Sequence, residues 1–330
     1  MTTRVIRPTA LKRLKDTYRD KGIILPALER HVMQQLNAAE PDLTQDYMHP
    51  SEMSKSEWCA RHDYYRILGT PSEKVSARNP SFRMNNIFAE GHAIHGKYQT
   101  WLWEMGVLFG DWRCHECKHR WGALSPKECQ FCQSTDISYI EVPLRHKEYR
   151  VEGHADGAVI DLEGYTGLIE IKSIGMRSLA FEAPRLYHLY EQGMSADEIW
   201  FGIKRPFATH LRQGQLYLWM SQPAYDSIVF IYESKFHQQT KEFLVRYNKK
   251  LIEPILADAR EVSHGLKSGV APNRPPWAES QANVVCKSCP FRRTCWNMGA
   301  RNGSPSSTTQ PTLIIQRGDP AKRRRALRKA

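Results

Sequence analysis

The chain has 330 residues, of which 41% are hydrophobic and 10% aromatic, a composition that can bury a core and excludes wholesale disorder. Its formal net charge is +12 and its pI about 9.3, which favours a polyanionic partner such as nucleic acid. No apolar run approaches the ~20 residues that cross a bilayer, and the first residues lack the apolar stretch of a secretory signal. We therefore expect a cytoplasmic protein with no membrane partner.

Hydrophobic periodicity and turn residues predict a mixture of helices and strands. We expect a helical lead-in over residues 1–50, followed by helices over about 57–68 and 87–107. A compact cysteine-bearing insert over 112–134 comes next. The remaining expected elements are strands over 149–161 and 167–173, a helical or mixed stretch over 178–191, a helix start at 195–198, a helix over 209–220, a strand over 228–233 and a helix over 241–266.

The last segment, residues 301–330, has the composition of a flexible linker followed by a basic tail. Residues 301–312 are rich in Ser, Thr and Pro, and residues 318–330 hold six Lys or Arg against one Asp. Such a tail serves either as a solubilising end or as a sequence-independent, salt-dependent contact to phosphates. The sequence leaves both interpretations open.

Three charged residues stand on the two adjacent strands expected before and after residue 164. Side chains alternate along a strand, so Glu170 and Lys172 share one face of a strand whose other face is apolar. An antiparallel hairpin would bring Asp156 beside Glu170. Two converging carboxylates make an oxygen-rich site for Mg²⁺ or Mn²⁺, and a nearby ammonium can hold or deprotonate an attacking water. Because Glu-x-Lys is common on solvated strand faces, other residues must support this interpretation.

Two further motifs flank this hairpin in the sequence. His95, in Gly91-x3-His95 on the expected third helix, can supply a metal-binding imidazole. Gln213 and Tyr217, four residues apart on a later helix, share one face and can point at a phosphate or a base. Each motif alone is weak, because a histidine on a helix surface is common. Their order and spacing around the acidic hairpin give them weight.

The stretch Gly91 to Lys97 also fits the G-x4-G-K pattern of a phosphate-binding loop. Tyr98 stands where such a loop needs Ser or Thr to ligate Mg²⁺, and no apolar strand precedes the stretch. The sequence therefore predicts no helicase motor.

The succession Gly-x3-His, Gly-x2-Asp, Glu-x-Lys and Gln-x3-Tyr resembles the RecB-like branch of the PD-(D/E)XK nucleases, over roughly residues 51–297. The resemblance implies a restriction-endonuclease-like α/β core, a central mixed sheet flanked by helices, within a nuclease domain over 51–300. It implies a metal held by His95, Asp156, Glu170 and the main-chain carbonyl of Ile171, with Lys172 helping to activate water. It also implies a DNA groove lined by Gln213, Tyr217 and His210.

Two C-x2-C pairs in the insert, Cys114-x2-Cys117 and Cys129-x2-Cys132, have the spacing of a zinc ribbon, in which four thiolates bind Zn²⁺. His115 and His119 are close enough in the sequence to compete as ligands. One interpretation is that the metal only folds a small insert that cannot bury its own core. The other is that the insert also contacts DNA or a partner through Arg113, Lys118, His119, Arg120 and Trp121.

The other four cysteines are split between the two ends of the expected nuclease domain. Cys286, Cys289 and Cys295 lie close together, and Cys59 is the one cysteine left to complete a set of four. Four thiolates suit a [4Fe–4S] cluster or a structural Zn²⁺, and spacing alone does not choose between them. One cysteine before the core and three after it resembles the iron–sulfur nucleases related to AddB and to the CRISPR-associated exonuclease called Cas-four. The resemblance favours a structural [4Fe–4S] cluster that closes the domain.

These observations favour a Mg²⁺- or Mn²⁺-dependent deoxyribonuclease, an exonuclease acting on single-stranded DNA ends in recombination, repair or phage DNA processing. A helicase, recombinase or integrase would then be supplied in trans. One alternative is a DNA end processor of CRISPR adaptation that acts with an integrase complex. Another is a non-catalytic DNA-binding scaffold, although a binding module has no need to bury two acids and a lysine.

Overall fold

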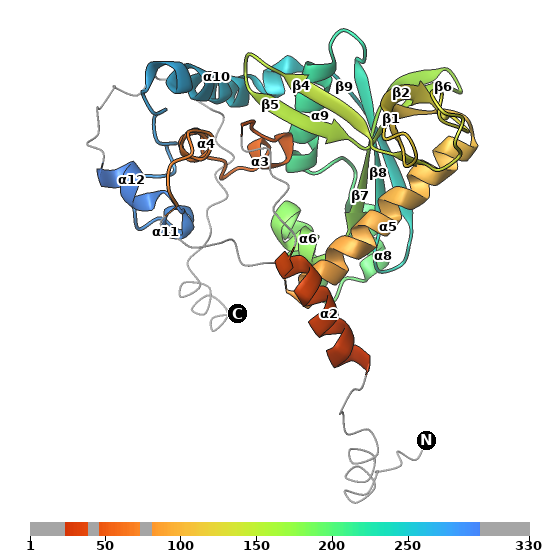
Figure 1. Cartoon of the computed structure of the whole chain (residues 1–330). Coiled ribbons are helices and arrows are strands. Elements are labelled where there is room, and N and C mark those ends of the chain that lie inside the picture. Colours follow the sequence, from red (N-terminus) through yellow and green to blue (C-terminus); the bar gives the residue numbers. More distant parts are fainter. Residues whose placement is uncertain (1–23, 39–45, 73–80, 298–330) are drawn as a thin grey trace, which may run out of the picture.

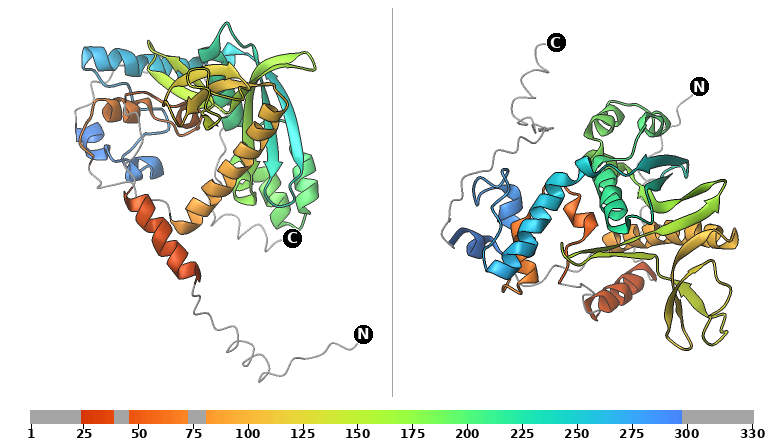
Figure 2. Two further views of the ribbon diagram at one scale, coloured as in Figure 1. Left: turned by 45° about the vertical axis from the view of Figure 1, so that its right-hand side comes forward. Right: turned by 90° about the horizontal axis from the view of Figure 1, so that it is seen from above.

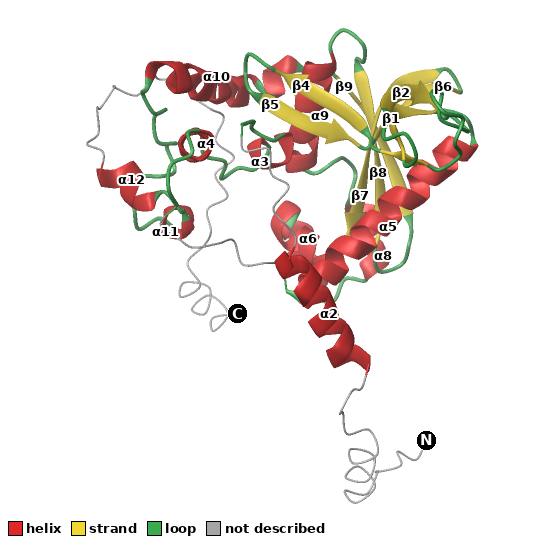
Figure 3. Cartoon of the chain, in the orientation of Figure 1, coloured by secondary structure: helices red, strands yellow, loops and turns green. Residues whose placement is uncertain are grey.

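The computed structural model describes residues 24–38, 46–72 and 81–297. The predicted lead-in over 1–50 is therefore described only in part, and the predicted linker and basic tail over 301–330 lie outside the described residues. The described chain is mixed α/β, with a central sheet flanked by helices (Figures 1 and 3). None of the helices in these ranges combines the length and the apolar character that a bilayer span needs.

The central sheet has the strand order β2-β1-β6-β7-β8-β9, with β3 also paired to β1. Only β7 and β8 run parallel, so the sheet is mixed. A separate two-stranded sheet is made of β4 and β5. The strands are β1 Leu108–Cys114, β2 Arg120–Leu124, β3 Ile137–Tyr139, β4 Val142–His146, β5 Val151–Ala155, β6 Gly157–Leu162, β7 Tyr165–Ile174, β8 Ser227–Ser234 and β9 Thr240–Arg246.

Helices cover both faces of this sheet (Figures 1 and 2). Ile94 of α5 (Phe82–Glu104) packs on one face against Leu108 and Ile169. Leu218 of α9 packs on the other face against Leu168 and other apolar strand residues. Because parallel strands need a long crossover, the chain between β7 and β8 forms the helices α6 Met176–Glu182, α7 Pro184–Glu191, α8 Ala196–Gly202 and α9 Ala208–Ser221.

A third hydrophobic cluster joins segments from the two ends of the described chain. Tyr65 of α4 packs with Phe291, which precedes α12, at 5.9 Å between ring centroids. In Figures 1 and 2 these helices gather to one side of the sheet. The remaining helices are α2 Ile24–Ala38, α3 Pro50–Met53, α4 Ala60–Ile67, the 3-10 helix η1 Lys249–Leu251, α10 Glu253–Ser268, α11 Val284–Ser288 and α12 Arg292–Asn297.

Two predicted elements were wrong. The helix expected over 241–266 begins as strand β9, whose exposed and half-buried residues alternate along its length. That period of two is typical of an edge strand with one covered face, and the helix α10 starts only at Glu253. The single strand expected over 149–161 is broken at Asp156 into β5 and β6, which belong to different sheets.

Glycine at position 214 is required by the close approach of α9 to β8. A Cβ added there would lie 2.5 Å from Cζ of Phe230, a fully buried side chain. We expect Gly214→Ala to push α9 off the sheet and to lower the free energy of unfolding by roughly 1–3 kcal/mol, measured by urea denaturation. Gly96→Ala is the matched control, because Gly96 lies inside α5 with no atom within 4 Å of the added Cβ; helix propensity makes it neutral or stabilising. Equal stability of the two variants would contradict this constraint.

Candidate functional site

The predicted acidic pair meets where β6 begins beside β7. The antiparallel register pairs Gly157 with Ile169, which puts Asp156 directly across from Glu170. The predicted juxtaposition is therefore confirmed. Both carboxyl groups are buried, with 6% of Asp156 and 2% of Glu170 exposed. Burying such groups costs free energy unless they are paired, protonated or bound to a cation.

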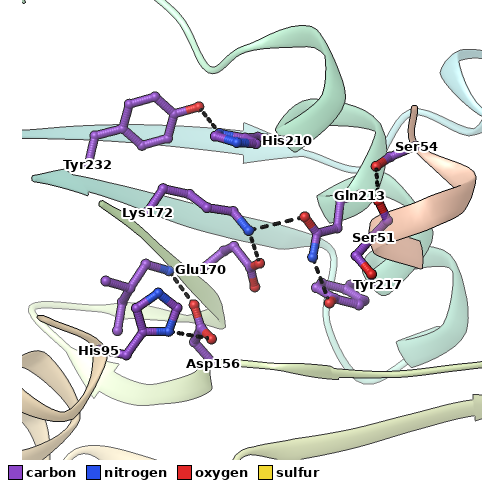
Figure 4. A network of polar contacts seen from close by, with 11 residues as sticks. Ser51, Ser54, His95, Asp156, Glu170, Lys172, His210, Gln213, Tyr217 and Tyr232 are labelled. Carbon is purple, nitrogen blue, oxygen red and sulfur yellow. Dashed lines mark hydrogen bonds and ion pairs between the residues drawn. The ribbon is translucent and has the colours of Figure 1, made fainter. Parts of the chain in front are cut away.

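Asp156 is fixed by contacts from the sheet and from α5 (Figure 4). Its Oδ2 accepts the backbone N–H of Ile171 at 2.5 Å, and its Oδ1 lies 3.1 Å from Nδ1 of His95. Gln99 of α5 donates to the backbone carbonyl of Asp156 at 2.9 Å. Burial alone lowers the pKa of His95, but the hydrogen bond and charge of Asp156 outweigh it and raise that pKa above its usual value.

A chain of hydrogen bonds leads from Glu170 to α9 (Figure 4). Nζ of Lys172 donates to Oε1 of Glu170 at 2.7 Å and to Oε1 of Gln213 at 3.1 Å. Nε2 of Gln213 donates to the hydroxyl of Tyr217 at 2.8 Å. The predicted Gln-x3-Tyr pair is thus buried and contacts the lysine. Burial favours a neutral Lys172, yet the charges of Glu170 and Asp156 raise its pKa overall, so it is a cation at neutral pH.

Glu141, which was not predicted from the sequence, completes an acidic group with His95 and Asp156. One potential ligand atom from each of the three residues lies within 4.8 Å of the others. Glu141 has a φ of +73°, a left-handed conformation uncommon for a residue with a side chain. Its carbonyl accepts the N–H of Asp111 at 2.8 Å, which ties it to β1. The only sequence signal is an acid directly before a strand, and that signal is too common to be useful.

The crowding of these carboxyl groups fits a divalent cation. Burial, and then the charge of Asp156, raise the pKa of both Glu141 and Glu170 to about 7. Oε2 of Glu170 is buried and has no hydrogen-bond partner among the residues that the structure describes. Carboxylate oxygens and one imidazole nitrogen are ligands that Mg²⁺ and Mn²⁺ accept. We call His95, Glu141, Asp156, Glu170 and Lys172 the acidic cluster.

His210 lies on α9 beside Lys172, where the charge of that lysine adds to burial in lowering its pKa well below the usual value. The hydroxyl of Tyr232 accepts the backbone N–H of Phe207 at 2.9 Å and lies 2.6 Å from Nδ1 of His210. Because Tyr232 is fully buried, its own proton is donated to Nδ1. The neutral ring therefore carries its proton on Nε2, which becomes a donor next to the acidic cluster.

Replacing Tyr232 by Phe tests this assignment. In the unaltered protein we expect the ring nitrogens of His210 to show the Nε2–H tautomer by ¹⁵N NMR, with no protonation until the pH is well below the usual pKa of histidine, about 6.5. Tyr232→Phe removes the donor to Nδ1 and the acceptor of Phe207, so the tautomer should become mixed and the protein should lose roughly 1–3 kcal/mol of stability. An Nδ1–H ring in the unaltered protein would show the assignment to be wrong.

The four cysteines of the insert converge, as the spacing predicted. The sulfur atoms of Cys114, Cys117, Cys129 and Cys132 all lie within 4.8 Å of one another. Each sulfur also accepts a backbone N–H, from Glu116 and Cys117, His119, Phe131 and Ser134 respectively. Converging thiols with backbone donors aimed at them fit one tetrahedral metal ion. The ring of His119 instead stacks on Phe131 at 4.3 Å between centroids.

The insert is continuous with the central sheet. Strand β1 pairs with β6 at Leu108 and Phe109 and then extends outward to pair with β2 and β3. Cys114 ends β1, so the cysteine-bearing loops stand at the tip of an extension of the main sheet. We call residues 112–134 the cysteine ribbon.

Two of the other four cysteines, Cys289 and Cys295, pack against the third hydrophobic cluster, and Cys59 and Cys286 both lie near Cys295. Burial, together with the charges of Cys295 and Cys289, raises the pKa of Cys59 to about 12, and Cys295 also acts on Cys286. Unlike the ribbon sulfurs, they do not form a group within 4.8 Å in the described chain. A cluster of several atoms keeps its thiolates farther apart than a single ion does. Four thiols brought near one another offer a donor set for a metal ion or a metal cluster.

No protein-family model matches this chain, and no curated protein sequence matches it. Among solved structures, an alkaline exonuclease from Laribacter hongkongensis (LHK-Exo) is 12% identical, with a TM-score of 0.36; the match covers 68% of this chain and 90% of that chain. The same exonuclease in complex with dAMP gives a TM-score of 0.34 at 12% identity and the same coverage. A protein called SSO0001 also gives 0.34 at 12% identity, covering 82% of this chain and 96% of that chain. Likenesses this distant carry no argument about function.

Proposed function

We propose that this protein is a divalent-metal-dependent nuclease that hydrolyses phosphodiester bonds in DNA. The observation that supports the proposal most is that two buried carboxyl groups, Asp156 and Glu170, lie side by side on neighbouring strands. Lys172 donates a hydrogen bond to Glu170. Burying these groups is costly, and a protein that only binds DNA gains nothing from it. The net charge of +12 suits a polyanionic substrate.

His95, Glu141 and Asp156 would hold the cation, with Glu170 and the carbonyl of Ile171 as further donors. A bound cation would polarise the scissile phosphate and offset its charge. These roles rest on the donor chemistry of the acidic cluster and on the motif resemblance.

Lys172 would position the attacking water. A lysine ammonium has three N–H donors, and two of them bind Glu170 and Gln213. The third is available to a water or a phosphate oxygen. Oε2 of Glu170, which has no hydrogen-bond partner among the described residues, is left to the cation, and the proton that the water loses would pass to the leaving oxygen. The water oxygen would bond to phosphorus, the bridging P–O bond would break, and the leaving oxygen would take up a proton.

Nε2–H of His210 would donate to a phosphate oxygen beside the lysine, and Gln213 with Tyr217 would keep Lys172 in place. We extend the proposal to an exonuclease acting on single-stranded ends in recombination, repair or phage DNA processing. A helicase, recombinase or integrase would act in trans.

Replacing Lys172 by Ala is the direct test of the nuclease proposal. We expect the cutting rate to fall by about 10²-fold or more, in the range seen for a missing general acid–base or electrostatic group, while DNA binding is retained. The assay uses end-labelled single-stranded, duplex and circular DNA with Mn²⁺; linear strands should shorten and circles should persist. Lys55→Ala, which removes an exposed lysine that pairs with Glu52 on the surface, serves as the matched control.

Two acidic substitutions separate a metal role from a structural one. Asp156→Ala should be inert at every Mn²⁺ concentration, whereas Glu141→Gln should need more Mn²⁺ for the same rate because it removes one anionic donor. Cutting by Asp156→Ala, or an absence of cutting by folded unaltered protein on all three DNAs, would refute the proposal.

We also propose that Cys59, Cys286, Cys289 and Cys295 hold a structural [4Fe–4S] cluster and that the cysteine ribbon holds Zn²⁺. Anaerobically purified protein should contain iron, acid-labile sulfide and zinc, with broad visible absorbance. Cys59→Ser should lose iron and absorbance and unfold at lower temperature, because the cluster joins the two ends of the domain. Cys117→Ser, the matched control, should lose zinc and keep iron. Zinc at both sites would contradict the iron–sulfur assignment.

A further inference from the structure

Two arginines of the cysteine ribbon stand directly opposite each other. The register pairs Arg113 of β1 with Arg120 of β2. The next pair along the two strands, Cys114 and His119, is joined by a backbone hydrogen bond from the N–H of Cys114 to the carbonyl of His119, at 3.0 Å. The arginines therefore form a non-hydrogen-bonded pair, the kind in which cross-strand side chains lie closest.

This pairing is unfavourable without a counter-charge. Like charges directly opposite on neighbouring strands destabilise a sheet. Both arginines are exposed, and neither forms an ion pair with a carboxylate in the part of the chain that the structure describes. Asp111, two residues along β1 on the same face, is among the carboxylates that do not pair with them. Two adjacent guanidinium groups without a carboxylate partner among the described residues make a site for an anion.

The arginine pair is on the same face of the sheet as the acidic cluster. Alternation puts Phe109 and Arg113 on one face of β1, and Phe109 packs against the cluster of core residues that includes Leu168. Leu168, Glu170 and Lys172 are every second residue of β7, so their side chains lie on that same face.

The distance between the two sites is short. Phe109 of β1 pairs with Ala158 of the antiparallel neighbour β6. Continuing this register puts Asp111 at the level of Asp156, and Arg113 lies two residues farther along β1. At about 3.4 Å per residue and about 4.8 Å between strands, the two backbones lie on the order of 10 Å apart. The charges of Arg120 and Asp111 both act on the exposed His154, next to Ala155 and Asp156 in the sequence. A DNA strand at the acidic cluster could therefore reach the pair within a few nucleotides.

We propose that Arg113 and Arg120 bind the phosphate backbone of the single DNA strand whose scissile phosphate lies at the acidic cluster. The inference rests on the proposed nuclease function. The guanidinium fork matches a phosphate in geometry and charge, and a phosphate between the two arginines removes their mutual repulsion. The ribbon thereby adds a strand contact beside the cut.

A different role for the arginines must be separated from this one. A Zn²⁺ ion with four thiolates carries a net charge of −2, and the arginines flank two of its ligands in the sequence, Cys114 and Cys117. If the arginines only offset that charge, replacing them would release zinc, and the affinity for DNA would come from other parts of the protein.

The experiment measures equilibrium binding by the full chain in an Asp156→Asn background, which prevents turnover. A fluorescent single-stranded oligonucleotide is titrated at several KCl concentrations, and the zinc content of each protein is measured by elemental analysis. Arg113→Gln/Arg120→Gln is compared with Lys249→Gln/Lys250→Gln, which removes the same charge from the exposed η1 turn. Arg113→Lys/Arg120→Lys keeps the charge and removes the fork.

We expect the arginine-to-glutamine variant to retain zinc and to bind DNA more weakly. The slope of log K against log salt should decrease by about 0.7 for each phosphate of the single strand that the variant no longer neutralises. The η1 control should keep the slope. The lysine variant should keep most of the slope but bind with lower affinity.

Unchanged slope and affinity in the glutamine variant would overturn the proposal. So would loss of zinc in that variant together with unchanged DNA affinity in the lysine variant. Because binding is measured without turnover, these results do not depend on whether the unaltered protein cuts DNA. A protein that binds through the arginines and never cuts would refute only the nuclease function.

Discussion

The hydrogen bond from the backbone N–H of Ile171 to the carboxylate of Asp156 is the contact on which the site depends. In an unbroken sheet this N–H would be bonded to a carbonyl of the neighbouring strand, since buried backbone donors need a partner. Here the side chain of Asp156 takes that place, at the point where one strand stops and the chain enters another sheet. The bond gives the backbone N–H of Ile171 in β7 a partner, orients the carboxylate beside Glu170, and permits β5 to leave the central sheet.

The charged groups around this bond are only partly offset by one another. Lys172 offsets Glu170, and His95 offsets Asp156, but Glu141 brings in a further acid and Oε2 of Glu170 has no partner. Burial, and then the charge of Asp156, raise the pKa of Glu141 and of Glu170. A folded centre that is short of positive charge is prepared for a cation, and this is why the acidic cluster favours metal-dependent chemistry over a purely structural ion-pair network.

The two groups of four cysteines lie in different parts of the fold. The cysteine ribbon lengthens the central sheet beyond β6 and carries the arginine pair at its tip. Cys289 and Cys295 of the second group pack against the hydrophobic cluster formed by α4, α10 and Phe291, where segments more than 200 residues apart meet. One group thus stands on an extension of the central sheet, and the other stands where the early and late segments of the described chain pack together.

The sequence by itself determined the elements with a clear period and the ligands with short spacing. Alternation placed Glu170 and Lys172 on one strand face, and the C-x2-C pairs defined the ribbon, because these patterns depend only on residues close together in the chain. The position of Asp156 across from Glu170 also followed, since a hairpin brings its two strands together locally. The sequence does not predict strand β9, because Phe243, Leu244 and Val245 are consecutive apolar residues and hide the alternation that burial shows.

Only the tertiary structure decided which distant residues join these local patterns. Glu141 reaches the acidic cluster through a left-handed backbone and a bond to β1, neither of which leaves a sequence signal. The tautomer of His210 depends on Tyr232 from another element, and the opposition of Arg113 and Arg120 depends on strand register. Long-range pairing sets all three, because register and burial arise from the packing of the whole sheet rather than from local residue preferences.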